Sequence, residues 1–332
     1  MRESDRMKAR PIAALTLFAS AALFSLSQMP VSPERVVEYH RTPGSLFEPH
    51  TTVLFGGDMM FDRYIRQTMD NYGGNFIFSC IADVLSSADL VVANLEGPIT
   101  EYTSVSLGSE VGKPDNLIFT FPTEVATLLV RYNIRLVSLG NNHTLNLGWD
   151  GMHSTRAALR AARVGYFGVS PREGQESGSF DGASKIENIN GVPLAFINYN
   201  EFALEGWRAN AEAARAQIVE ARKHGYLPIV YTHWGDEYAT ISVPRQRVLA
   251  HDFVDAGAEM VIGSHPHVIE ESELYNEKHI YYSLGNFIFD QYWDDDVRTG
   301  LLLRVTFTSR GVERIEEIRV QLERDGRTCL VE

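Results

Sequence analysis

Short apolar segments alternate along this chain with longer segments of helical periodicity. Nearly continuous apolar runs predict buried strands, and the chain has such runs at 52–57, 90–95, 134–139, 194–199, 227–232, 259–262 and 280–284. Helical patterns lie between them, at 76–86, 122–132, 151–163, 210–225 and 244–257. Alternation of strands and helices predicts a layered α/β domain.

Two hairpins are predicted in addition. Residues 301–308 and 312–322 alternate apolar and polar positions on either side of Ser309-Arg310-Gly311, which indicates an antiparallel pair that closes the sheet. Residues 186–198 contain Asn190-Gly191, a pair typical of a tight hairpin turn. No internal repeat is visible, and residues 51–325 are expected to form one domain.

The first 31 residues have the pattern of a targeting segment. Four of the first ten residues are basic, and an uncharged, mostly apolar run follows from residue 12 to about residue 31. The pattern predicts a signal peptide or an uncleaved N-terminal membrane anchor, with a buried core helix as the alternative. The protein is therefore expected to be exported, either to the extracytoplasmic face of the cell membrane or into the medium. Residues 32–50, with three prolines, are expected to be a linker.

Composition and charge narrow the range of functions. The chain has 332 residues, of which 44% are hydrophobic and 22% charged, as in globular proteins. Its net charge of −13 disfavours nucleic acid as a partner. The two cysteines, Cys80 and Cys329, are too few for a disulfide scaffold, and the sequence leaves open whether they pair.

Polar residues gather where the predicted strands end. They are Asp58, Asn94, Glu96, Asn141, Asn142, His143, His233, His265, His267 and Asn286. A turn or a helix cap would explain an Asp or Asn on its own, but two imidazoles as close as His265 and His267 are costly to bury without partners. Two carboxylates, an amide and three imidazoles together favour a site for Mn, Fe or Zn, and the absence of cysteine argues against structural zinc.

The motifs around these residues resemble the CapA-type family of poly-γ-glutamate capsule synthesis proteins. The resemblance covers about residues 52–305. It rests on Gly57-Asp58 with Arg63, Asn94-Leu95-Glu96-Gly97-Pro98, Asn141-Asn142-His143, His233-Trp234-Gly235, Gly263-Ser264-His265-Pro266-His267 and Tyr282-Ser283-Leu284-Gly285-Asn286-Phe287. That family is similar to the calcineurin-like metallophosphoesterases, so the resemblance implies a four-layer α/β/β/α sandwich with two divalent metal ions.

The resemblance also implies a role for each site residue. Asp58 and His267 would bind the first metal, with Glu96 in the bridging position. The second metal would be bound by Asn142, His233 and His265. His143 would protonate the leaving group. Arg63 would contact an anionic oxygen of the substrate, with a surface salt bridge as the alternative.

Two departures from the metallophosphoesterase pattern leave the activity open. Met60 stands where that superfamily has a histidine, and Glu96 stands where it has an aspartate. One expectation is a metal-dependent hydrolase that acts on a phosphoester or on a γ-glutamyl bond of an anionic polymer. The alternative is a non-catalytic, polymer-binding component of a membrane complex that makes or exports the capsule. Motifs for nucleotide cofactors and for serine hydrolases are not found in the sequence.

Overall fold

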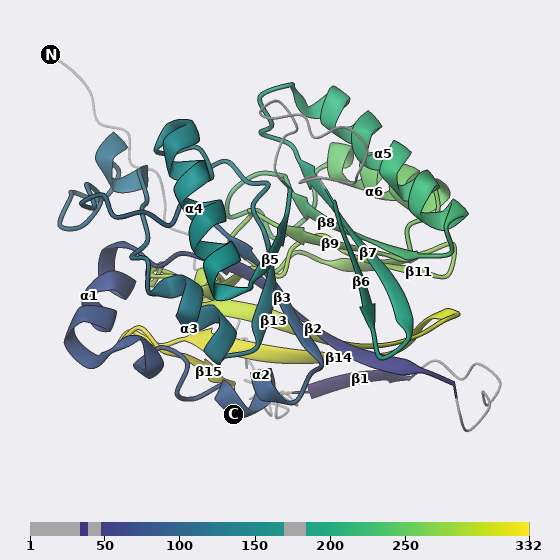
Figure 1. Ribbon diagram of the computed structural model, residues 1–332, viewed down its shortest axis with the longest axis horizontal. Helices are drawn as coiled ribbons and strands as arrows, with labels where there is room; N and C mark the ends of the chain where they lie inside the picture. Colours follow the sequence, from purple (N-terminus) through teal and green to yellow (C-terminus); the bar gives the residue numbers. More distant parts are fainter. Residues whose placement is uncertain (1–33, 39–47, 169–183, 332) are drawn as a thin grey trace, which may run out of the picture. The chain divides into compact units, whose positions relative to one another are not determined.

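The computed structural model describes residues 34–38, 48–168 and 184–331, whose strands form two β-sheets (Figure 1). The first sheet runs in the order β1-β14-β13-β2-β3-β4-β5, with β12 beside β2 and β15 beside β14. Its strands are β1 (Glu34–Glu38), β2 (His50–Met59), β3 (Leu90–Leu95), β4 (Ile134–Ser138), β5 (Gly165–Phe167), β12 (Asn286–Ile288), β13 (Thr299–Thr308), β14 (Gly311–Leu322) and β15 (Thr328–Leu330). Strands β2 to β5 are parallel, whereas β13 and β14 are antiparallel.

The second sheet runs in the order β10-β11-β9-β8-β7-β6. Its strands are β6 (Ser184–Ile189), β7 (Val192–Asn200), β8 (Leu227–His233), β9 (Met260–Ser264), β10 (Ser272–Tyr275) and β11 (Lys278–Tyr281). Strands β7, β8, β9 and β11 are parallel, and β6 and β10 complete hairpins at the edges. Parallel strands place their carboxyl ends at the same edge of each sheet, where ligand sites form in α/β proteins.

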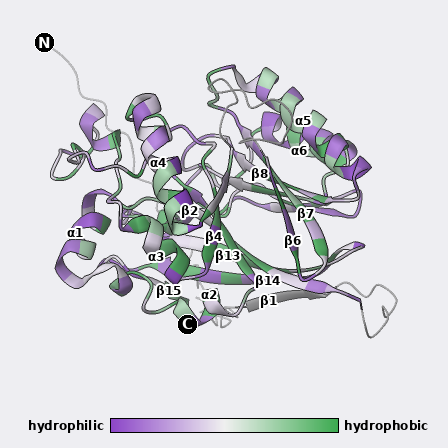
Figure 2. Ribbon diagram, viewed as in Figure 1, coloured by the Kyte–Doolittle hydropathy of each residue, from purple (hydrophilic) through white to green (hydrophobic). Residues whose placement is uncertain are grey.

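Seven α-helices are found in the described residues. They are α1 (Arg63–Tyr72), α2 (Ala82–Ser86), α3 (Val125–Arg131), α4 (Gly148–Ala162), α5 (Trp207–Lys223), α6 (Pro244–Asp255) and α7 (Asp295–Arg298). Among them, none is long and apolar enough to cross a bilayer. Figure 2 shows many hydrophilic residues on α1 and α5, whereas β13 in the first sheet is largely hydrophobic.

The alternation of side chains along each strand produces the layers. On β2, Val53 and Phe55 lie in a core that includes residues of both sheets, while Leu54 lies in a core shared with α1, α3 and α4. On β8, Ile229 lies in the core between the sheets, and Val230 packs with α5 and α6. Each large apolar side chain buried in this way contributes about 1.5–3 kcal/mol. The predicted α/β/β/α sandwich is confirmed.

Most of the predicted elements are confirmed, with shifts of a few residues at their ends. The predicted hairpin at residues 186–198 is formed by β6 and β7, and both Asn190 and Gly191 have the positive φ that its tight turn requires. The antiparallel pair predicted at residues 301–322 is formed by β13 and β14.

Several elements differ from the prediction. The short strands β5, β10, β12 and β15 and helix α7 were not predicted. The helix predicted at residues 76–86 is reduced to α2, because the residues before it form tighter turns. In these turns the N–H of Ser79 donates to the Phe76 carbonyl at 3.1 Å and the N–H of Ile81 to the Phe78 carbonyl at 3.0 Å. Helix α1 was not predicted, since its buried face consists of only Ile65, Thr68 and Met69.

The N-terminal predictions fall mainly outside the described residues. The signal peptide or anchor predicted at residues 1–31 lies wholly outside them. Within the predicted linker, 32–50, the structure describes two parts, and one of them is strand β1, which pairs with Arg314–Ile318 of β14. That part of the stretch adds a strand to the edge of the first sheet.

Candidate metal centre

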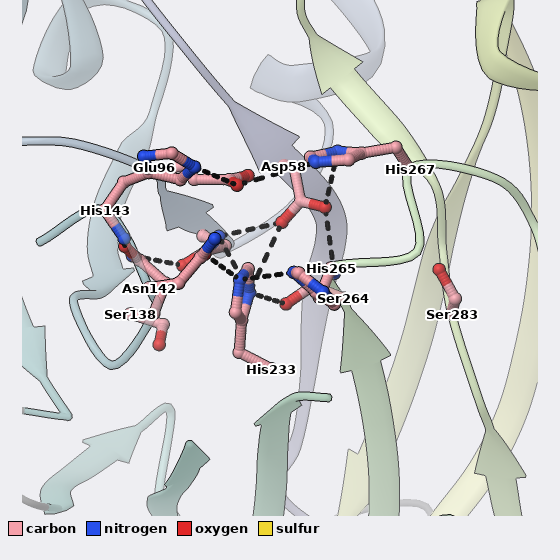
Figure 3. Close-up of polar contacts among 12 residues, drawn as sticks. Asp58, Glu96, Ser138, Asn142, His143, His233, Ser264, His265, His267 and Ser283 are labelled. Atoms are coloured by element: carbon pink, nitrogen blue, oxygen red, sulfur yellow. Dashed lines mark hydrogen bonds and ion pairs between the residues drawn. The ribbon is translucent and has the colours of Figure 1, made fainter. Parts of the chain in front are cut away.

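Strand ends from both sheets bring the predicted site residues together (Figure 3). Asp58 ends β2, Glu96 follows β3 and the loop after β4 carries Asn142 and His143. From the second sheet, His233 ends β8 and the loop after β9 carries His265 and His267. In Figure 3, Asp58 lies between His267 and His233, and Glu96 lies beside His143. The expectation that these strand ends converge is therefore met in the fold.

Asp58 is fully buried and held in place by hydrogen bonds. Its Oδ1 accepts from Asn94 Nδ2 at 2.7 Å, and its Oδ2 accepts from the backbone N–H of His265 at 3.0 Å. Both donors favour the ionised form, but burial outweighs them and raises the pKa of Asp58 to about 6. The backbone bond to His265 joins the two sheets at this point.

Glu96 is also fully buried, but neither of its carboxylate oxygens has a hydrogen-bond partner among the described residues. Its Oε1 lies 3.6 Å from His267 Nε2 and 3.9 Å from His143 Nε2. Burial and the neighbouring charge of Asp58 raise the pKa of Glu96 well above its ordinary value. A buried carboxylate without a donor is stable only if it holds a proton or faces a cation. Asp58, Glu96 and His267 place one ligand atom each within 4.8 Å of one another.

The imidazole of His267 presents an unprotonated nitrogen to this carboxylate. Its Nδ1 lies 2.9 Å from Asn286 Oδ1. The Nδ2 of Asn286 donates to three oxygens, including Gln291 Oε1, which fixes Oδ1 as the acceptor for His267. The proton of His267 is therefore on Nδ1, and the lone pair of Nε2 is directed at Glu96.

The ring of His143 is held in the same way as that of His267, with Nδ1 facing an asparagine oxygen. Its Nδ1 lies 3.1 Å from Asn146 Oδ1, which also accepts from the backbone N–H of Phe119 at 2.8 Å. Because that backbone donor fixes the amide of Asn146, the proton of His143 is on Nδ1 and its Nε2 has the free lone pair. Burial lowers the pKa of His143 to about 4, so the ring is neutral near pH 7.

A second group of ligand atoms surrounds His233. Ser264 donates its hydroxyl to the Thr232 carbonyl at 2.8 Å and accepts from His233 Nδ1 at 3.0 Å. His233 Nε2 then faces Asn142 Oδ1 at 2.8 Å and His265 Nδ1 at 3.2 Å. Two ligands of one metal ion lie about 2.9–3.4 Å apart, because metal–donor bonds are about 2.0–2.1 Å long. Both distances from His233 Nε2 are close to the spacing of two ligands on a single ion.

Burial also keeps the other site histidines neutral. It lowers the pKa of His265 to about 4, and it lowers those of His233 and His267 well below the ordinary value. A neutral imidazole is the form that binds a metal. His265 and His267 also have positive φ angles, +98° and +59°, which non-glycine residues rarely adopt. The loop is strained where it presents both rings.

The structure thus brings six predicted ligands into two adjoining groups. The first contains Asp58, Glu96 and His267, and the second contains Asn142, His233 and His265. Met60 adds no ligand, because it is fully buried in the core that faces the helices. Arg63 is close enough to influence the pKa of Glu96, but its terminal nitrogens are engaged by Asp290 and Asn116.

Sequence reasoning assigned no role to the residues that orient the ligands. Asn94 donates to Asp58, and the side-chain oxygens of Asn146, Ser264 and Asn286 each contact the Nδ1 atom of one site imidazole. Asn146 carries a weak signal in the sequence, since it lies three residues after His143 in a turn. The other three lie within the quoted motifs, but only the fold shows which side chain each one contacts.

Comparison with known proteins identifies the family. Residues 52–291 match the family model described as bacterial capsule synthesis protein PGA_cap. The chain belongs to this family. The predicted resemblance to CapA-type proteins is thereby confirmed.

Two relatives in the genus Bacillus are 30% identical to this PGA_cap chain. The match to the PGA biosynthesis protein CapA of Bacillus subtilis covers 79% of this chain and 69% of that protein. The match to the capsule biosynthesis protein CapA of Bacillus anthracis covers 73% of this chain and 60% of that protein. The chain thus spans about three fifths to two thirds of the length of these relatives. A solved structure of the sulfate thiohydrolase SoxB of Thermus thermophilus aligns at 12% identity over 70% of this chain and 38% of that chain, with a TM-score of 0.43.

Proposed function

We propose that this PGA_cap protein is an exported, metal-dependent hydrolase that cleaves an anionic polymer of the cell envelope, of the poly-γ-glutamate type. The observation that carries the proposal is the buried Glu96 carboxylate. It accepts no hydrogen bond from the residues that the structure describes, and it lies among imidazole nitrogens with free lone pairs. Divalent cations satisfy such a set of acceptors. The polymer is suggested by the names of the relatives, which refer to PGA and to capsule biosynthesis.

The chain offers ligands for two ions of Mn, Fe or Zn. Asp58, Glu96 and His267 would hold one ion, and the group around His233 would hold the other. Divalent ions bound there lower the pKa of water and polarise a carbonyl or phosphoryl oxygen. His143 presents an unprotonated Nε2 to the same space, so it would accept the proton that the attacking water releases and pass it to the leaving nitrogen or oxygen.

The disulfide between Cys80 and Cys329 supports export. Disulfides persist in oxidising compartments outside the cytosol and are rare within it. The apolar N-terminal segment supports the same proposal, because it follows basic residues at the start of the chain.

The test is the metal content and activity of the full chain, purified with detergent to keep the N-terminal segment soluble. The protein is supplied with Mn, Fe and Zn and then desalted. About two ions per chain are expected in the wild type, with a sharp loss in Glu96→Gln and in the double variant His233→Ala, His265→Ala. Glu101→Gln, at an exposed carboxylate, is the matched control. Cleavage is followed as shortening of poly-γ-glutamate, with p-nitrophenyl phosphate as the phosphoester probe. A wild type without metal would reject the proposal.

A second candidate function is a non-catalytic, polymer-binding component of a membrane capsule complex. The buried Met60 favours it, because the first group then has only one imidazole. In that case the protein would bind metal and polymer but leave both probes intact.

A further inference from the structure

Arg63 is predicted to contact substrate, yet its side chain is already engaged and largely buried. Its Nη2 forms an ion pair with Asp290, and its Nη1 donates to Asn116 Oδ1 at 3.2 Å. Nε has no hydrogen-bond partner within the described part of the chain and is buried, so a substrate in solution cannot reach it. Only 14% of the side chain is exposed. An arginine that binds a substrate anion needs accessible guanidinium nitrogens, whereas those of Arg63 are engaged or buried.

The guanidinium lies instead over two aromatic rings that contact site histidines. Its Cζ is 5.1 Å from the ring centre of Phe119 and 5.5 Å from that of Phe289. The Phe119 ring lies 4.4 Å from the His143 ring, and the Phe289 ring lies 4.8 Å from the His267 ring. Each histidine is thus connected to the same cation through one phenylalanine.

The backbone around Arg63 is fixed as firmly as its side chain. Arg63 has a φ of +47°, a conformation that persists only when its surroundings impose it. Its N–H donates to Asp62 Oδ1 at 3.0 Å, and the N–H of Tyr64 donates to Asp290 Oδ2 at 3.1 Å. Asp290 therefore binds both the guanidinium and the start of α1, although it is 227 residues away from Arg63.

We propose that Arg63, anchored by Asp290, is a positioning residue for the metal centre. It holds the two phenylalanine rings against His143 and His267, so that the Nε2 atoms of both imidazoles stay directed at the buried carboxylate. A planar guanidinium is needed for this role, because it stacks on aromatic rings and pairs with a carboxylate at the same time. The inference rests on the metal centre proposed above.

The experiment compares Arg63→Lys and Asp290→Asn with the wild type, using the full chain in detergent. Arg156→Lys is the matched control, because Arg156 lies over Tyr166 at 5.6 Å and is not one of the site residues. Two constants are measured by titration calorimetry: the affinity for Mn²⁺, and the affinity for inorganic phosphate at saturating Mn²⁺. A positioning role predicts Mn²⁺ binding that is about 10- to 100-fold weaker in both variants, with phosphate affinity and the control unchanged.

Loss of phosphate affinity with unchanged Mn²⁺ affinity would overturn the proposal and make Arg63 a substrate-binding residue. Wild-type affinities in both variants would overturn it as well. If the wild type binds no Mn²⁺, the proposed function fails, and spectra of the metal-free protein with ¹⁵N-labelled histidine decide the role of Arg63. Loss of the Nδ1–H signals of His143 and His267 in Arg63→Lys would support positioning, and their retention would reject it.

Discussion

At the scale of single residues, the chemical mark of the candidate metal centre is Glu96, a buried carboxylate that accepts no hydrogen bond from the described residues. Outside the proposed ligand set, Glu270 shares this feature at one of its two carboxylate oxygens. It is 3% exposed, and its Oε2 accepts from Gln246 Nε2 at 2.7 Å, whereas its Oε1 has no hydrogen-bond partner in residues 48–168 or 184–331. Burial raises the pKa of Glu270 to about 8. The folded protein therefore keeps this carboxyl protonated at pH values where the unfolded chain has released the proton.

This difference predicts a pH dependence of stability. Between the unfolded pKa of 4.5 and the folded pKa of about 8, the unfolded state binds fewer protons at Glu270 than the folded state. The contribution of Glu270 to the free energy of unfolding is thus full below pH 4.5, declines as the pH rises and becomes constant above about pH 8. Glu270→Gln removes this decline. The free energy of unfolding of the variant should therefore increase relative to that of the wild type as the pH rises from 4.5 to about 8.

Urea unfolding of both proteins from pH 4 to pH 9 measures the effect. The difference between variant and wild type isolates Glu270 from other groups that titrate, including Asp58. A difference that is the same at every pH would show that Glu270 is ionised in the folded protein.

At the scale of elements, the site depends on the close approach of β2 to the segment that leads into β12. A Cβ atom at Gly57 would lie 1.8 Å from the backbone oxygen of Gly285, which also accepts from the N–H of Asp58 at 3.1 Å. Only glycine fits there, and the next residue is a predicted metal ligand.

Gly57→Ala is therefore expected to lower the free energy of unfolding by about 2–3 kcal/mol, since the backbone at Gly285 cannot yield as a side chain would. Displacement of Asp58 should also reduce the metal content. Gly165→Ala is the control, because its Cβ would meet the flexible Leu136 side chain at 3.1 Å. Urea unfolding measures the free energy of unfolding of both variants. An equal decrease in Gly57→Ala and Gly165→Ala would contradict this account of Gly57.

At the scale of the whole molecule, the disulfide joins positions 249 residues apart. Cys80 lies just before α2 and Cys329 lies on β15, so the bond ties the end of the described chain to the helical layer of the first sheet. Closing a loop of this length restricts the unfolded chain.

Removal of the bond is expected to cost about 2–4 kcal/mol. Dithiothreitol should lower the urea midpoint of the wild type, whereas the double variant Cys80→Ser, Cys329→Ser should have a low midpoint with or without reductant. A reduced wild type that unfolds at the same midpoint as the oxidised one would show that the bond adds no stability.

Local patterns in the sequence determined most of the longer strands and helices, the layered α/β class and the identity of the candidate ligands. Apolar periodicity reports which face of a segment is buried, and this property depends on neighbours in the chain. The motif spacing then placed Asp58, Glu96 and the histidines at strand ends. Elements without a strong apolar pattern, such as α1, could not be found in this way.

Only the tertiary structure determined which side chains form hydrogen bonds, ion pairs and the disulfide with one another. The sequence left the pairing of the cysteines open and left Arg63 either in contact with substrate or in a salt bridge. It contained no sign that Glu96 lacks a donor among the described residues. Arg63 and Asp290 meet only because β2 and β12 lie side by side. Hydrogen-bond partners, free lone pairs and pKa shifts depend on groups that are distant in the chain and adjacent in the fold, and no local pattern records that proximity.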